Sequence, residues 1–197
     1  HDSVRVEVAP AAQFQRVHLL LRVLVVAALS MLHGSDLGLF GLLYFFLPVI
    51  AAILVAQRGA ARYLGSDASW LVPLLEWVLG FYAYMLFVTD VFPLGQAERA
   101  VRLRVSAAGS PSVGSALLRL LTSIPFLLVL LLIGLGSFVI SVIAALNILL
   151  FQSYPRAMRS FQQDVIGWMA RLFAYHASLV EDYPSLSYAA RTRDAQA

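Results

Sequence analysis

Two long runs of apolar residues dominate the sequence. Between residues 23 and 57 the only charged side chain is that of Asp36, and residues 120–155 contain no Asp, Glu, Lys or Arg. A helix crosses the hydrocarbon core of a bilayer in about 20 residues, so each run has the length of a helical hairpin. Turn signals lie near both midpoints, HGSDLG at 33–38 and GLG at 134–136. We therefore predict transmembrane helices at about residues 17–33, 37–57, 117–133 and 137–152.

A helix of mixed polarity follows each apolar run. The first contains WVLGFYAYMLFVTDVFP (77–93), and the second contains WMARLFAYHASLVEDYP (168–184). Wound as an α-helix, the second gathers polar residues into one stripe, which comprises Asp164, Arg171, Tyr175, Ser178 and Asp182. Such a helix suits the boundary between water and lipid, so we predict a cytoplasmic interfacial amphipathic helix at about 158–181. Its counterpart at about 68–90 is more apolar, and it either lies at the same boundary or enters the bilayer as a re-entrant helix.

A short segment of alternating polarity precedes each apolar run. These segments are VRVEV at 4–8 and VRLRV at 101–105. A period of two residues is typical of a strand with one buried face. We therefore expect two short cytoplasmic strands that pair with each other.

The same order of elements occurs twice along the chain. A shift of 97 residues aligns Arg22 with Arg119, and a shift of 91 residues aligns Trp77 with Trp168. This self-similarity predicts a tandem repeat. The expected boundaries are a first repeat at 1–93, a linker at 94–99, a second repeat at 100–184 and a polar C-terminal tail at 185–197.

The distribution of charge indicates how the repeats lie in a membrane. Hydrophobic residues make up 60% of the 197 residues and charged residues only 13%, which is the composition of a membrane protein. All 14 basic residues are Arg, and neither predicted hairpin tip contains one. The positive-inside rule then places both repeats the same way up, with both termini in the cytoplasm. Arg22 and Arg119, one turn inside their helices, are expected to reach back to the headgroups.

The predicted fold is therefore an all-α membrane protein made of two parallel tandem repeats. Each repeat is a transmembrane helical hairpin followed by a cytoplasmic interfacial helix, with a short β segment before the hairpin. We expect the protein in the bacterial inner membrane. Arginines scattered beside apolar spans orient a protein in the bilayer, so we do not predict nucleic-acid binding in spite of a net charge of +3.

Candidate functional side chains gather in the second repeat. Candidates for lipid-headgroup or partner contacts are Arg156, Arg159, Trp168, Arg171 and Tyr175, because Arg binds phosphate and amphipathic aromatic rings favour headgroup depth. The alternative is a solvated helix face with internal ion pairs. A second candidate is the small-residue face of Ser137, Ser141 and Ala145, which would pack either within the bundle or against a partner.

Recognised motifs of enzymes and metal proteins are missing from the sequence. It contains no GxSxG elbow, P-loop, HExxH or GxGxxG, and no cysteine. His18 and His33 would lie at opposite ends of one predicted helix, too far apart to share a metal ion. We therefore predict no catalytic residue, no cofactor and no metal ligand.

The second repeat resembles an uncharacterised family of prokaryotic integral-membrane proteins that is known only as a domain of unknown function. The matching motifs are Tyr154-Pro155-Arg156, Gly167-Trp168, Arg171, Ala174-Tyr175 and Glu181-Asp182-Tyr183-Pro184. The first repeat matches less well, since it has Gly80 where Arg171 stands. The resemblance implies the architecture and implies no chemistry.

From these features we expect a non-catalytic accessory or scaffold subunit of a larger membrane complex. Its partners would be other integral membrane proteins and phospholipids. The alternative is a lipid- or small-solute-handling protein that uses an Arg-lined cytoplasmic boundary.

Overall fold

The computed structural model describes residues 3–9, 15–33, 37–92 and 100–186. Most of these residues are helical. The elements in chain order are β1 (Val4–Val8), α1 (Arg16–His33), α2 (Leu37–Arg58), the short α3 (Ala60–Arg62), a π-helical turn η1 (Tyr63–Asp67), α4 (Ala68–Met85), β2 (Val101–Val105), α5 (Val113–Thr122), α6 (Ile124–Phe151) and α7 (Arg156–His176). The predicted linker and most of the predicted C-terminal tail lie outside the described residues.

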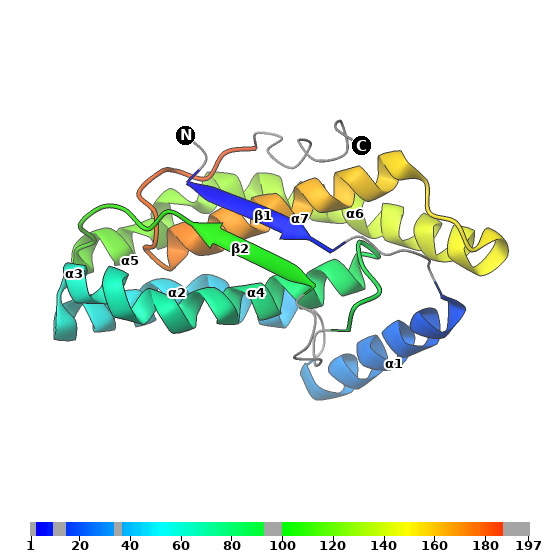
Figure 1. Cartoon of the computed structure of the whole chain (residues 1–197), viewed down its shortest axis with the longest axis horizontal. Helices are drawn as coiled ribbons and strands as arrows, with labels where there is room; N and C mark the ends of the chain where they lie inside the picture. Colours follow the sequence, from blue (N-terminus) through cyan, green and yellow to red (C-terminus); the bar gives the residue numbers. More distant parts are fainter. Residues whose placement is uncertain (1–2, 10–14, 34–36, 93–99, 187–197) are drawn as a thin grey trace.

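The elements form three layers (Figure 1). The two strands lie at the front, where β1 packs on α7 and β2 packs on α4. The helices α4 and α7 form the middle layer and contact each other. Behind them lie α2, α5 and α6, and α1 packs beside α6.

The two strands pair as expected from their alternating sequences. They are antiparallel, with Val4 opposite Val105 and Val8 opposite Val101. The Val and Leu side chains of both strands face the helices, and Arg5, Arg102 and Arg104 are exposed on the other face. Burial of one apolar face against α4 and α7 explains why two strands of only five residues each are held in register.

The predicted hairpin of residues 117–133 and 137–152 is wrong. The chain breaks at Ser123, which separates α5, of only ten residues, from α6, of 28 residues. Pro125 stands in the first turn of α6 and has no N–H to donate to the carbonyl oxygen of Leu121, which favours a helix start at this point. The GLG segment at 134–136 stays helical inside α6, because an isolated glycine costs a helix only about 1 kcal/mol.

In the helix predicted at 158–181, the polar stripe does not lie at the surface. A helix does occupy most of this range, but α7 lies at the centre of the fold, and its residues from Val165 to His176 are buried with the one exception of Gly167. Even Asp164 and Arg171, expected on a solvated stripe, are 4% and 9% exposed. The sheet, α4 and the rear layer cover α7 on several sides, and this explains why its polar groups are buried.

The helices predicted at 17–33 and 37–57 are present as α1 and α2. Within the described part of the chain, two helices, Gly38–Arg58 and Ile124–Phe151, are long and apolar enough to cross a membrane. This composition supports a membrane protein. The counterpart helix predicted at 68–90 ends earlier than expected, at Met85.

Candidate functional site

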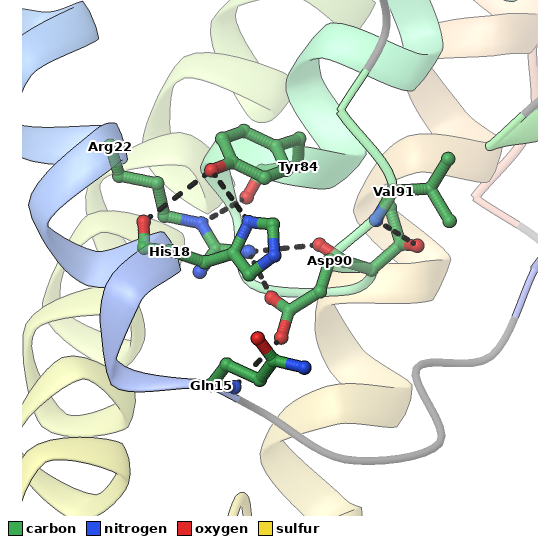
Figure 2. Close-up of polar contacts among 7 residues, drawn as sticks. Gln15, His18, Arg22, Tyr84, Asp90 and Val91 are labelled. Atoms are coloured by element: carbon green, nitrogen blue, oxygen red, sulfur yellow. Dashed lines mark hydrogen bonds and ion pairs between the residues drawn. The ribbon is translucent and has the colours of Figure 1, made fainter. Parts of the chain in front are cut away.

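A buried arginine from α1 binds the C-terminal end of α4 (Figure 2). The guanidinium of Arg22, which is 3% exposed, donates hydrogen bonds to the carbonyl oxygens of Tyr84 (2.7 Å) and Thr89 (2.8 Å). It also forms an ion pair of 2.7 Å with Asp90 and lies 4.2 Å from the centre of the Tyr84 ring. From the preceding turn of α1, the His18 ring contacts the Tyr84 hydroxyl at 3.1 Å. We call this group the Arg22 clamp.

A second buried arginine, from α5, binds the C-terminal end of α7 in the same way. The guanidinium of Arg119, 6% exposed, donates to the carbonyl oxygens of Tyr175 and Val180, the latter at 2.6 Å. It lies 4.4 Å from the centre of the Tyr175 ring, whose hydroxyl contacts Thr122 at 3.0 Å. Burial lowers the pKa of Arg119, and the nearby Tyr175 acts in the opposite direction. We call this group the Arg119 clamp.

The helix ends that receive the two arginines have the same backbone geometry. Phe87 and Ser178, 91 residues apart, both adopt a left-handed conformation, with φ of 60° and 53°. The next residue is Val88 in one case and Leu179 in the other. Its N–H donates a hydrogen bond to the carbonyl oxygen five residues earlier, at 2.9 Å for Val88 and 3.0 Å for Leu179. This is the Schellman ending of a helix, in which backbone N–H groups bind some of the last carbonyl oxygens. The carbonyl oxygens of Tyr84 and Tyr175 thus each accept a backbone N–H, from Phe87 and Ser178, as well as the arginine.

An acidic residue completes each helix end and binds the backbone just before the helix that carries the arginine. Asp90 accepts a hydrogen bond from the N–H of Gln15 (3.1 Å), which precedes α1. Glu181 accepts one from the N–H of Ser110 (3.0 Å), ahead of α5. These bonds fix the entry of both helices, so each clamp ties two segments that are distant in the sequence.

The clamps use the electrostatics of helix ends. The last carbonyl groups of a helix carry partial negative charge and lack partners within the helix, so a cation placed there is stabilised. At the end of α7 the carbonyl oxygen of Ala177 accepts a further hydrogen bond, from the Tyr63 hydroxyl. Burial raises the pKa of Tyr63, which keeps this hydroxyl a donor. The chemistry of the clamps is therefore that of interhelix connections.

The Arg119 clamp predicts a strong effect of adding one methyl group at Gly109. This residue has φ +110°, and a Cβ there would overlap the carboxylate of Glu181. We expect Gly109→Ala to lower the free energy of unfolding by about 2–3 kcal/mol, from backbone strain and from displacement of Glu181. Gly114→Ala is the matched control, because a Cβ at Gly114 in α5 meets no atom within 4 Å. Thermal unfolding of the two variants in detergent measures the difference, and equal melting temperatures would contradict the geometry.

A third buried polar group links α2, α5, α6 and α7. Pro48 has no N–H, so the carbonyl oxygen of Tyr44 is free of its usual helical partner and lies 2.9 Å from Nδ1 of His176. The other ring nitrogen, Nε2, lies 2.7 Å from the Ser123 hydroxyl, which in turn contacts the Tyr44 hydroxyl at 2.8 Å. With Nδ1 donating, Nε2 accepts from Ser123. Burial lowers the pKa of His176 to about 4, so the ring is neutral at pH 7.

Ser123 and His176 have the hydrogen-bond distance of a nucleophile and its base, but their environment is unsuitable for catalysis. Both are 0% exposed, so a substrate has no access to the hydroxyl in this structure. A nucleophile must also reach the reacting atom of its substrate. The group is therefore better described as a junction that fixes the start of α6 against α2 and α7.

The predicted small-residue face of α6 contacts α7 within the molecule. The side-chain amide of Gln162 donates to the carbonyl oxygen of Ser137 (2.9 Å) and to the hydroxyl of Ser141 (3.0 Å), and the Ser137 hydroxyl donates back to the Gln162 oxygen. Ala145 lies on the same helix and packs against the small cluster of Phe87, Ala144 and Ile148. All three small residues thus have contacts within the molecule.

The five side chains expected at a headgroup site do not share one surface. Arg156 is exposed and Arg159 is half-buried, both in the first turns of α7. Trp168 is buried beside Phe161, Arg171 is buried and donates to the carbonyl oxygen of Ser185 (2.9 Å), and Tyr175 lies under Arg119. Only the N-terminal end of α7 therefore presents the expected cationic surface.

The sequence pattern points to Arg22 and Arg119 but predicts the wrong environment for both. They were expected to reach the headgroups, and the structure buries both against helix ends. The signal was present in the self-alignment of the chain, because a shift of 97 residues pairs the two arginines and a shift of 91 residues pairs Tyr84 with Tyr175. The role of His176 depends on Pro48 in a different helix, which no local pattern reveals.

Within the described residues, no group of three or more His, Cys, Asp or Glu side chains is arranged to hold a metal ion. Comparison with known proteins found no match among curated proteins and none among solved structures. One family model does match, and it confirms the resemblance of the second half to an uncharacterised family. Residues 114–187, which include all but the first residue of α5, the whole of α6 and α7, and the Arg119 clamp, match the family described as a domain of unknown function (DUF4389).

Proposed function

We propose that the protein is a non-catalytic accessory or scaffold subunit of a larger membrane-protein complex. The observation that supports this most is how the side chains are distributed. Buried polar groups, such as Arg22, Arg119 and Gln162, bind the chain's own helices together. By contrast, large apolar side chains of α2 and α6 are exposed on the outside, where Leu135 is 67% and Phe45 is 62% exposed. Such a molecule offers surface to lipids and to other membrane helices.

We further propose that this surface is built by two parallel tandem repeats. The support is the recurrence of one arrangement at two places. Arg22 and Arg119 each bind two carbonyl oxygens at a helix end, and the bound residues are spaced by 91 in each case. The antiparallel pairing of β1 with β2 is what a twofold axis perpendicular to the sheet would produce. The location in the bacterial inner membrane and the cytoplasmic position of both termini stay predictions. They are based on where the arginines lie along the sequence.

Purification from native membranes tests the scaffold role. The tagged full-length chain is extracted with a mild detergent, and the proteins that remain bound are identified and quantified by mass spectrometry. We expect at least one other integral membrane protein in fixed stoichiometry across independent preparations. A chain that purifies alone, while still folded by circular dichroism, would contradict the proposal.

One observation favours the handling of anionic lipids as a second candidate function. Arg156 is exposed directly after the apolar helix α6, where a guanidinium could bind a lipid phosphate. This function predicts that Arg156→Ala reduces the anionic phospholipid that is retained after purification, whereas Arg104→Ala on the sheet does not. Equal lipid retention in the two variants would remove this candidate.

A further inference from the structure

We propose that the protein inserts into one leaflet of the bilayer, with its three layers stacked along the membrane normal and α2 and α6 lying along the membrane. The surface that binds the acyl chains is the outer face of α2, α5 and α6, and the sheet faces water. This proposal goes beyond the scaffold role and does not depend on it. It would replace the multi-pass topology expected from the sequence. It also keeps the exposed arginines of the sheet on one side of the membrane.

The face of the sheet that points away from the helices is cationic. Arg5 and Arg104 stand directly opposite each other in the register, and Glu7 stands opposite Arg102. The Arg104 side chain is 71% exposed, and its contact with Glu7 is long, at 3.8 Å. Exposed guanidinium groups of this kind require water or anionic headgroups around them.

The middle layer exposes tryptophan at its edge. Trp70 and Trp77 of α4 are 45% and 43% exposed and share one face of the helix. Tryptophan side chains favour the depth of the headgroups, between water and hydrocarbon. The middle layer therefore has the chemistry of the membrane boundary.

The rear layer exposes apolar side chains along its whole length. The exposed apolar side chains of α6 include Leu128, Leu132, Leu135, Phe138, Leu146 and Leu150. Because α7 covers the other side of α6 and the sheet covers α7, this surface faces away from the sheet (Figure 1). From the front to the back of the molecule, the exposed surface is thus first cationic, then contains tryptophan, and is finally apolar. One leaflet of a bilayer has the same order, from water through the headgroups to the hydrocarbon.

The packing of α6 argues against an upright position across the membrane. Gln162 contacts the middle of α6 and His176 contacts its start at Ser123, so α7 runs antiparallel beside α6 over most of its length. An upright α6 would take α7 and the sheet that covers it into the hydrocarbon. Each arginine at the bilayer centre costs about 2.5–3.5 kcal/mol on insertion scales, and the exposed face of the sheet has three.

The arrangement of the two apolar helices gives a second argument. Near the start of α2, Tyr44 contacts Ser123, at the start of α6, and α2 then packs along α5. From this junction α2 and α6 extend toward opposite ends of the molecule (Figure 1). At 1.5 Å per residue, the 14 residues of α2 beyond Tyr44 and the 28 residues of α6 are about 21 and 42 Å long. Because they extend in opposite directions, their combined length far exceeds a hydrocarbon core of about 30 Å. Two helices that crossed one bilayer would lie side by side.

Depth measurements on single-cysteine variants test the proposal, and the chain has no cysteine of its own. The positions are Leu128, Leu135 and Leu146, which are exposed on one face of α6 over about 27 Å of helix, together with Arg104 on the sheet. Each full-length variant is spin-labelled and reconstituted into vesicles of phosphatidylethanolamine and phosphatidylglycerol. The depth of each label is obtained from its relative accessibility to oxygen and to a water-soluble nickel complex.

We expect the three α6 labels to lie at the same depth within a few ångströms, below the headgroups of one leaflet, and the label at position 104 to lie in water. Labels at 128 and 146 near opposite membrane surfaces would show a crossing helix and overturn the proposal. Water exposure of all three α6 labels would overturn it as well. Neither result depends on whether a partner protein is found, so a failure here is distinct from a failure of the scaffold role.

Discussion

Arg119→Ala is expected to lower the free energy of unfolding by about 3–5 kcal/mol. The substitution removes two hydrogen bonds from a charged donor, at about 1.5–3 kcal/mol each. The carbonyl oxygen of Val180 loses this donor, while that of Tyr175 keeps the hydrogen bond from the Ser178 N–H. It also removes the guanidinium that lies 4.4 Å from the centre of the Tyr175 ring. Because these carbonyls belong to the end of α7, we expect the loss to affect the whole fold and not α5 alone.

Chemical denaturation in detergent, followed by tryptophan fluorescence and circular dichroism, measures this loss. Arg104→Ala removes the same charge from an exposed position and should change the stability by less than about 0.5 kcal/mol. Arg119→Lys should recover only part of the loss, since an ammonium lacks the planar fork of donors. Arg22→Ala should resemble Arg119→Ala if the two clamps are equivalent. A loss of the same size for Arg119→Ala and Arg104→Ala would mean that Arg119 is not buried as described.

Acidification from pH 6.5 to pH 4 is expected to cost about 3 kcal/mol of stability through His176 alone. Burial lowers its pKa from 6.5 in the unfolded chain to about 4 in the folded protein. The folded state therefore binds the proton less readily than the unfolded state. The stabilisation is complete above pH 6.5 and is lost as the pH falls toward 4, at about 1.4 kcal/mol per pH unit.

The physical reason is that a proton on Nε2 would turn an acceptor into a donor. The Ser123 hydroxyl now donates to this nitrogen, and Nδ1 already donates to the carbonyl oxygen of Tyr44. The nearby Arg119 also disfavours a positive ring. The measurement compares unfolding of the native chain and of His176→Gln at several pH values, because carboxylates titrate in both and cancel in the difference. A native-minus-variant difference that stays constant from pH 7 to 4 would contradict a buried neutral imidazole.

Local patterns predicted the elements that depend on local chemistry. The alternation in VRVEV and VRLRV predicted two strands and their pairing, because burial of one strand face requires that period. The apolar run before Arg58 predicted α2 nearly to the residue. The self-similarity of the chain also pointed to Arg22 and Arg119 together. In these places the sequence pattern and the tertiary packing agree.

The errors arose where tertiary packing decides the environment of a residue. A helix with a polar stripe has the same sequence signature at a membrane surface and in a core where other segments bind its polar groups. In α7, Gln162 donates a hydrogen bond to α6, and Arg171 donates one to the carbonyl oxygen of Ser185. Likewise, the glycines at 134 and 136 predict a turn in the second apolar run, whereas the break lies at Ser123, two residues before Pro125.

Amide hydrogen exchange of α7 tests most directly the claim that this helix is the centre of the fold. The measurement follows the chain in detergent micelles and in lipid nanodiscs, with fragments that separate the partly exposed segment 156–160 from residues 164–176. We expect the latter amides to be among the slowest to exchange in both media, and to become faster in Arg119→Ala. Rapid exchange along the whole of α7 would show a peripheral helix and would contradict the account.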